Sequence, residues 1–146
     1  MTNIDIEREL FELKTSNTPL ELTDGTFIEI PPYPEFGFLG DDETEAYEEL
    51  QFETESYDRV DDVVIPAVTE DDGRVVPART VKGPLRQPYQ QDGKLVKPSF
   101  RVRVARAALG DETYAKLKAD GKGSADVWKV WNSQVARAQT LLESLD

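Results

Sequence analysis

The chain contains neither cysteine nor histidine, and these two absences restrict its chemistry more than any other feature of its composition. Without cysteine it has no disulfide, no thiolate metal ligand and no thiol nucleophile, which fits a reducing compartment. Without histidine, the commonest general base and the commonest metal ligand are both missing. We therefore expect a protein that is not an enzyme and that carries no cofactor and no metal ion.

Long apolar runs are missing as well, and no stretch approaches the roughly 18 apolar residues of a membrane span. Residues 1–8 carry acids where a signal peptide has a basic segment followed by an apolar one. These features predict a cytosolic protein. The 146 residues suffice for one domain with a sizeable core, but not for two large ones.

The charges are divided unevenly between the two halves of the chain. Residues 1–72 hold 22 Asp and Glu against 3 Lys and Arg, whereas residues 73–146 hold 7 against 14, and the net charge is −12. Such asymmetry indicates that the two halves have different roles, or that one half packs against the other. The acidic half is an arm for a basic partner, a segment that folds back on the C-terminal half, or a solvated stretch that only keeps the protein soluble.

The first 40 residues predict a short helix followed by a β-hairpin. In residues 4–14 apolar side chains recur at helical spacing, with Thr2 or Asn3 as the cap. In residues 20–30 apolar and acidic side chains alternate on both sides of Asp24-Gly25, a pair that suits a tight hairpin turn.

A loop punctuated by proline and glycine follows, at residues 33–40. Its aromatic residues Tyr33, Phe36 and Phe38 have two interpretations. They fill a core against the hairpin, or they anchor a partner protein, since Tyr and Phe provide a large contact area at a low entropic cost.

The middle of the chain, residues 41–98, is predicted to be an acidic and then proline-rich linker or arm. Residues 41–58 have a weak helical stripe, but like charges four residues apart, such as Glu45 and Glu49, repel each other. We expect a marginal helix there, or disorder in isolation. Residues 63–81 and 89–97 each look like a further hairpin around an Asp-Gly turn, with prolines confining the strands to edges.

The C-terminal segment, residues 99–146, predicts three helices. The first ends at Gly110 and is helical at least over 104–109, while its start is also compatible with a strand. Asp111 and Ser124 are the expected caps of the second and third helices. The third helix has one broad apolar face, on which or near which lie Val127, Val130, Trp131, Val135, Ala138, Leu141, Leu142 and Leu145, with Trp128 at its edge. The predicted fold class is α+β.

Motifs for catalysis or ligand binding are sparse. The acids from Asp41 to Glu45 lack the spacing of a calcium loop. Gly121-Lys-Gly-Ser124 has the composition of a phosphate-binding turn, but a joint between two helices explains it better. The basic residues between Arg86 and Arg106 form a stretch that suits an acidic surface, because the negative net charge opposes binding to nucleic acid.

Two stretches around this joint resemble the tail assembly chaperones of long-tailed phages that infect actinobacteria. Ala107 to Leu117 contains the family's "Leu-Gly-acid-acid-x-Tyr" turn before a short helix. Gly121 to Trp131 contains a glycine-rich step and "Ser-Ala-x-Val" at the start of the last helix. The Thr23–Thr26 turn and the acidic middle are also similar. The section from Pro66 to Pro98 is longer than in the family pattern, which keeps a virion structural protein open as an alternative.

The resemblance implies a protein without enzymatic activity that holds the aggregation-prone tape measure protein while tail tube subunits polymerise around it. The expected location is the host cell cytoplasm and not the mature virion, with the tape measure protein and the tail tube protein as partners and self-association as a further option. No membrane or direct nucleic-acid partner is expected. The candidate partner-binding residues are Tyr33, Phe36, Phe38, Val127, Trp128, Trp131, Val135 and Leu142. A third hypothesis is an acidic DNA mimic whose carboxylates between Asp41 and Asp62 stand in for phosphates.

Overall fold

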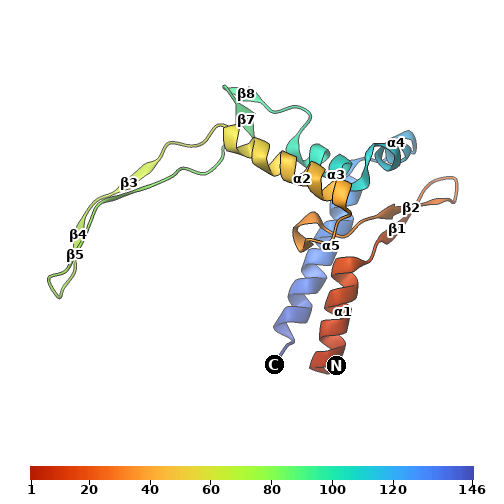
Figure 1. Cartoon of the computed structure of the whole chain (residues 1–146), viewed down its shortest axis with the longest axis horizontal. Coiled ribbons are helices and arrows are strands. Elements are labelled where there is room, and N and C mark those ends of the chain that lie inside the picture. The colour runs from red at the N-terminus through yellow and green to blue at the C-terminus, as the bar shows by residue number, and fades with distance from the viewer. The chain divides into compact units, whose positions relative to one another are not determined.

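The computed structural model describes all 146 residues, shown in Figure 1, and the chain divides into two compact units. Unit 1 comprises residues 1–52 and 98–146, and unit 2 comprises residues 53–97. The α+β fold class predicted from the sequence is confirmed. The segments 1–40 and 99–146, which the sequence separates, lie in one unit because their apolar faces bury each other.

Unit 1 begins with helix α1 (Asn3–Thr15), which confirms the helix predicted for residues 4–14. Its cap is Thr2, whose hydroxyl accepts a hydrogen bond from the Asp5 N–H at 3.2 Å, while the Asp5 carboxylate accepts one from the Thr2 N–H at 3.2 Å. This reciprocal pair satisfies two backbone donors that a helix otherwise leaves without partners.

The predicted hairpin is also confirmed, as β1 (Thr18–Glu21) and β2 (Phe27–Ile30). The strands are antiparallel, with Leu20 opposite Ile28, and Gly25 takes the positive φ of 86° that the turn requires. Strand alternation buries Ile28 and Ile30 and leaves Phe27 exposed. The following loop contains the 3₁₀ turn η1 (Pro34–Phe36).

The acidic stretch forms a regular helix, α2 (Asp41–Glu53), where the sequence predicts at most a marginal one. None of its side chains is fully buried, but Tyr47 and Leu50 pack against the core of unit 1. Acids also fill its first turn, where the helix dipole favours negative charge. Packing and the dipole therefore offset the repulsion between its acidic side chains.

The C-terminal half of unit 1 contains helices α3 (Phe100–Leu109), α4 (Asp111–Ala119) and α5 (Ser124–Glu143). Helix α3 begins at Phe100, so the alternative of a strand at its start is wrong. The caps of the other two helices differ from the prediction, because Gly110 and Gly123 take the cap positions. Asp111 instead pairs with Arg106 at 2.8 Å.

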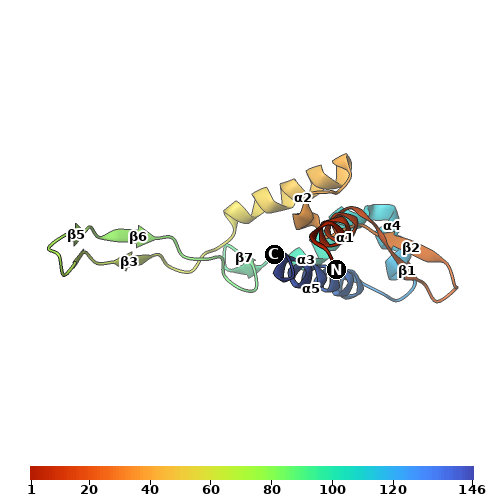
Figure 2. The same ribbon diagram turned by 90° about the horizontal axis from the view of Figure 1, so that it is seen from below.

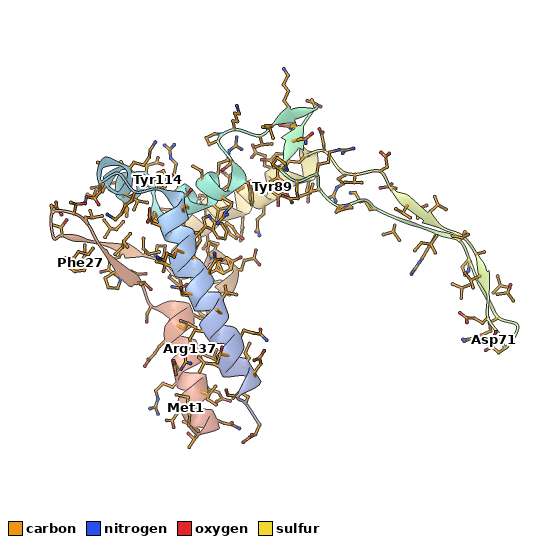
Figure 3. All side chains as sticks on the ribbon, turned by 180° about the vertical axis from the view of Figure 1, so that it is seen from behind. Met1, Phe27, Asp71, Tyr89, Tyr114 and Arg137 are labelled. Atoms are coloured by element: carbon orange, nitrogen blue, oxygen red, sulfur yellow. The ribbon has the colours of Figure 1, made fainter.

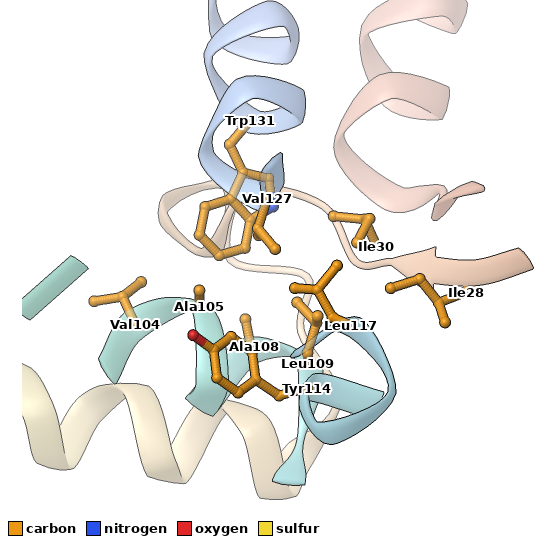
Figure 4. Close-up of a cluster of buried hydrophobic side chains, with 10 residues drawn as sticks. All are labelled: Ile28, Ile30, Val104, Ala105, Ala108, Leu109, Tyr114, Leu117, Val127 and Trp131. Atoms are coloured by element: carbon orange, nitrogen blue, oxygen red, sulfur yellow. The ribbon is translucent and has the colours of Figure 1, made fainter. Parts of the chain in front are cut away.

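The main core joins the hairpin to the three C-terminal helices (Figure 4). Trp131 lies at its centre, fully buried, and its indole N–H donates a hydrogen bond of 2.9 Å to the carbonyl oxygen of Pro31. The buried members are Ile28, Ile30, Val104, Ala105, Ala108, Leu109, Tyr114, Leu117, Val127 and Trp131.

A second, smaller core lies between α1 and α5, which run side by side in Figures 1 and 2. It consists of Ile6 and Leu10 from α1 with Ala138 and Leu141 from α5. Arg137 on α5 pairs with Glu9 on α1 at 2.8 Å. These contacts fix the C-terminal half of α5 against the start of the chain.

Unit 2 starts with the 3₁₀ turn η2 (Thr54–Ser56) and consists mainly of the two predicted hairpins, both of which are confirmed. In the longer one, β3 (Val63–Ile65) pairs with β6 (Arg79–Val81), and β4 (Val68–Thr69) pairs with β5 (Val75–Val76). Pro66 and Pro77 lie between the two ladders, as expected for residues that lack a backbone donor. The shorter hairpin pairs β7 (Gln90–Gln91) with β8 (Lys94–Leu95).

Hydrogen bonds at the start of the long hairpin hold its two strands together. Gly83 donates its N–H to the Asp62 carboxylate at 2.9 Å and accepts a bond from the Arg59 guanidinium at 3.1 Å. A Cβ atom at position 83 would lie 1.8 Å from the carbonyl oxygen of Val60, so only glycine fits there. Tyr57, also in unit 2, is buried, with its ring centroid 5.5 Å from that of Tyr89.

Candidate functional site

Helix α5 carries most of the predicted partner-binding residues, and the structure divides them between two stripes. One stripe faces the core, with buried side chains spaced alternately by four and three residues: Val127, Trp131, Gln134, Ala138 and Leu141. Two of the predicted residues, Val127 and Trp131, belong to it and have no exposed surface. They hold unit 1 together and are out of reach of a partner in the folded chain.

The second stripe on α5 has the same four-three spacing, displaced by one residue, and we call it the outer seam. Its members are Trp128, Asn132, Val135, Gln139 and Leu142. Val135 is 41% exposed and Leu142 is 48% exposed, whereas Trp128 is partly buried. Residues seven apart lie nearly above one another on a helix, so the three apolar members form a line along α5.

An aromatic cluster fixes one end of the outer seam. The Trp128 ring lies 5.0 Å from the Trp131 ring and 6.0 Å from the Tyr33 ring, measured between centroids. The Trp128 indole N–H donates to the Arg101 carbonyl oxygen at 3.0 Å, and the Arg101 guanidinium lies 5.0 Å from the indole ring. These contacts hold the tryptophan in one orientation, which leaves part of its surface available.

The loop residues predicted as partner anchors have three different environments. Tyr33 packs on the main core, and its backbone N–H donates to the Gln134 side chain at 3.0 Å. Phe36 is partly buried on the smaller core, below the Lys14 ammonium at 5.9 Å. Phe38 is 50% exposed, and its ring lies edge to face with that of Phe11, at 6.4 Å between ring centroids. Of the three, Phe38 is therefore the one that offers substantial surface.

Phe11 was not among the residues predicted from the sequence, although it is 63% exposed and completes an exposed aromatic pair with Phe38. A signal for it exists in the sequence, because Phe11 falls off the helical face formed by Ile6, Leu10 and Leu13. A large apolar side chain outside the core-facing stripe of a helix is worth testing as a contact residue.

An open groove of 470 Å³ lies on the opposite flank of α5, away from the outer seam. Its walls come from α1, β1 and α5, with Leu13, Leu20 and Val130 as apolar members and Lys129 and Asp126 as charged ones. Gln134 of the core-facing stripe also lines the groove. Its side-chain hydrogen bond to Thr18 joins α5 to β1 on that side.

Several other polar and charged side chains of unit 1 have hydrogen-bond or ion-pair partners close by. The Tyr47 hydroxyl donates to the Glu35 carboxylate at 2.8 Å, and its pKa is raised, first by burial and then by that carboxylate. Asp120 at the end of α4 pairs with Lys122 and accepts hydrogen bonds from Thr23, and these contacts lower its pKa. No three side chains of Asp and Glu converge on a common point as a metal site would require.

None of the five helices combines the length and the apolar character that crossing a bilayer requires. Comparisons with protein-family models, with curated proteins and with solved structures find no match for this chain. The functional argument therefore rests on the residues and their arrangement.

Proposed function

We propose that this protein is a phage tail assembly chaperone that holds the tape measure protein in a soluble form while the tail tube assembles around it. The proposal comes from the resemblance of residues 107–117 and 121–131 to that family, together with one structural observation. That observation is the outer seam of α5, in which the partly buried Trp128 and the exposed Val135 and Leu142 follow one another at heptad spacing. The expected location is the host cytoplasm, and the protein leaves before the virion is complete.

The outer seam suits a helical client because of its spacing. Two helices pack along a shared seam when apolar residues recur every 3.5 residues on average, and Trp128, Val135 and Leu142 recur every seven. A client helix laid along this line would cover the exposed parts of all three side chains. Full burial of a side chain such as Val or Leu contributes about 1.5–3 kcal/mol, so binding of this kind is moderate and reversible, as a chaperone requires.

The exposed Phe11–Phe38 pair offers a second apolar contact on unit 1. Aromatic side chains with few rotatable bonds lose little entropy when a partner covers them. Together with the outer seam, the pair would let one chaperone engage two turns or two segments of a long client.

The acidic surface supplies the solubility that a bound apolar client lacks. The net charge is −12, and helix α2 alone holds seven acids within 13 residues, all outside the core. Complexes that carry charge of one sign repel each other, which opposes their association. The tail tube protein is the second partner implied by this role, since it displaces the chaperone from the client.

The test is co-expression of the tape measure protein of the same phage with wild-type chain and with two matched variants. V135E/L142E places two acids on the outer seam, and A136E/T140E places two acids on exposed positions of the opposite side of α5. We expect wild type and A136E/T140E to keep the client in the soluble fraction and V135E/L142E to lose it. An insoluble client with the wild-type chain would refute the chaperone function itself.

A second candidate function is a virion structural protein, which the long hairpin of residues 63–81 favours. Extended arms with exposed apolar side chains are suited to lacing neighbouring subunits of a head or a connector. Mass spectrometry of purified virions separates the two functions. Stoichiometric amounts of this chain in the particle would support the structural role, whereas its absence would support the chaperone.

A further inference from the structure

The long hairpin of unit 2, residues 61–82, is an apolar ribbon without a core, and we call it the arm. Its six valines are between 43% and 65% exposed: Val63, Val64, Val68, Val75, Val76 and Val81. They lie on both faces of the ribbon, because neighbouring residues of a strand point to opposite sides. A lone two-stranded ribbon is marginally stable at best in water, so further contacts are needed to stabilise this one.

The two strands of the arm carry charges of opposite sign. The first strand, residues 61–70, has Asp61, Asp62 and Glu70 and no basic residue. The second strand, residues 74–82, has Arg74, Arg79 and Lys82 and no acidic residue. All six side chains are exposed. We refer to these as the acidic strand and the basic strand.

The pairing register brings the charges to matching heights along the arm. Val63 pairs with Val81 and Val68 pairs with Val76, so one register continues across the prolines. In that register Asp62 is level with Lys82. Glu70 is level with Arg74, and its N–H donates to the Arg74 carbonyl oxygen at 2.7 Å. Each strand also has one outer edge that pairs with no other strand (Figure 2).

We propose that arms from successive copies of this chain pair edge to edge, with the basic strand of one arm against the acidic strand of the next. Arms that lie side by side with their tips level form a continuous antiparallel sheet, because the basic strand runs toward the base of its arm and the acidic strand runs away from it. The tips carry Asp71, labelled in Figure 3. In this arrangement, with the register kept, Asp62 and Glu70 of one arm meet Lys82 and Arg74 of the next.

The charge pattern also selects against the commonest symmetric alternative. A two-fold dimer of arms would pair acidic strand with acidic strand, or basic with basic, and like charges placed opposite each other across strands are destabilising. Pairing of unlike edges is heterologous, so it generates a closed ring or an open chain instead of a two-fold dimer. Edge-to-edge pairing of the arms also gives hydrogen-bond partners to the backbone N–H and C=O groups at the outer edges of the arm. Left unpaired, such edges attract strands of unrelated proteins.

This self-association goes beyond the proposed chaperone function and does not depend on the outer seam. The test is sedimentation of the full chain over a range of concentrations. Two charge variants leave Asp62 and Arg74 unchanged. Asp62 accepts the hydrogen bond from the Gly83 N–H, and Arg74 pairs with Asp72, so both stabilise the hairpin itself. D61K/E70K makes both strands basic, and R79E/K82E makes both acidic. We expect association of the wild type to rise with concentration and to weaken with salt, because exposed charges are screened.

Each variant alone should sediment as a monomer, and an equal mixture of the two should associate again. This recovery distinguishes edge pairing from damage to the arm, since damage would persist in the mixture. A wild-type chain that stays monomeric at every concentration overturns the proposal. Association of either variant at the wild-type level also overturns it, because another surface would then be responsible.

Because the chain contains no cysteine, disulfide cross-linking between introduced cysteines provides a second test. It shows which strands of neighbouring arms meet. Thr69 and Val75 are opposite each other in the register of the arm, so in neighbouring arms the same two positions should come together. T69C and V75C, each prepared alone and then mixed under oxidising conditions, should give an intermolecular disulfide only in the mixture. A disulfide dimer from T69C alone would indicate two-fold pairing and refute the proposed arrangement, as would the lack of any disulfide in the mixture.

Discussion

At the scale of single residues, Gln134 connects three parts of unit 1 and is the one polar side chain that is fully buried. Its side-chain oxygen accepts from the Tyr33 N–H at 3.0 Å, and its side-chain nitrogen donates to the Thr18 hydroxyl at 3.2 Å. One amide therefore joins α5 to the start of β1 and to the aromatic loop. Buried polar groups of this kind are costly to leave without a partner.

Replacing this amide should destabilise unit 1 without changing its surface. We expect Gln134→Leu to lower the free energy of unfolding by about 1–3 kcal/mol, because a buried N–H and a hydroxyl lose their partner. Gln139→Leu, an exposed position on the same helix, should change it by no more than about 0.5 kcal/mol. Urea denaturation of both variants measures the difference, and equal effects would contradict the role assigned to Gln134.

Asp120 is the second residue that joins distant parts of the chain. Its carboxylate accepts hydrogen bonds from the N–H and the hydroxyl of Thr23, at 3.0 and 3.2 Å, and pairs with the Lys122 ammonium. The bond to Lys122, followed by those to Thr23, lowers the pKa of Asp120 below its ordinary value of 3.8. The turn of the first hairpin is thereby held at the end of α4.

This lowered pKa makes part of the stability dependent on pH. A carboxyl whose pKa is lower in the folded state than in the unfolded state stabilises the fold above the unfolded value of about 4, and the contribution is lost as the pH falls through the folded value. We expect wild type to be more stable than Asp120→Asn at pH 7, with the difference shrinking below pH 4. Thermal unfolding of both proteins between pH 2 and pH 7 measures it, and a difference that is independent of pH would contradict this assignment.

At the scale of elements, Gly110 determines how α3 leads into α4. Its φ of 83° and ψ of 156° belong to a region that is essentially restricted to glycine. The N–H of Gly110 still closes α3 through a bond of 2.9 Å to the Arg106 carbonyl oxygen. The backbone conformation of Gly110 therefore sets the direction in which α4 leaves α3, and the Arg106–Asp111 pair spans the same joint.

A side chain at this joint should cost stability even though there is space for it. We expect Gly110→Ala to lower the free energy of unfolding by about 1–3 kcal/mol, the range for a residue forced into a sparsely populated backbone region. Gly123→Ser is the matched control, because Gly123 has an extended φ of −160° and serine is a favoured cap. Chemical denaturation of the two variants should show a loss for the first and no loss for the second.

Elements determined by local chemistry were predictable from the sequence. The three Asp-Gly turns gave three hairpins, the Thr2 cap gave α1, and Gly110 gave the end of α3. The regular helix α2 was not predictable, because its partners are distant in sequence and only its repulsive charges are visible locally. The joining of the first and last segments into one unit has the same explanation, since burial between them depends on the tertiary structure.

The candidate site was predicted in outline only. The apolar face predicted for the last helix is too wide for one contact, and nothing in the sequence tells which stripe of it faces the core. The structure places the polar Gln134 in the core-facing stripe, beside Trp131, and leaves the apolar Val135 and Leu142 exposed. Which residues bind a partner stays a prediction until the seam variants are tested.

At the scale of the whole molecule, the two units differ in how their backbone is protected. Unit 1 surrounds two apolar cores, whereas the arm of unit 2 has exposed side chains along nearly its full length. Segments with few buried contacts open at low free energy and are preferred sites of proteolysis. The arm carries Arg74, Arg79 and Lys82 in such a segment.

Limited digestion with trypsin should therefore cut the arm first. We expect early cleavage at Arg74 or Arg79, whereas Arg103 in α3 and Lys116 in α4 are cut much later because they belong to packed helices. The two fragments should remain together and keep their helical circular dichroism, since each contributes to the cores of unit 1. Mass spectrometry and size exclusion measure both outcomes, and separation of the fragments after the first cut would contradict the two-unit organisation.

Unit 1 is built from two segments that are separated by unit 2 in the sequence. This arrangement also sets the order in which the protein is able to fold on the ribosome. Ile6, Ile28 and Ile30 are buried by residues that follow them by about a hundred positions, so these side chains leave the exit tunnel well before their covering helices exist. Contacts between segments so far apart form slowly, because a long loop must first close. The part of the nascent chain that emerges first is also its most acidic part. We expect charge repulsion between neighbouring nascent chains to oppose aggregation of the uncovered strand during that interval.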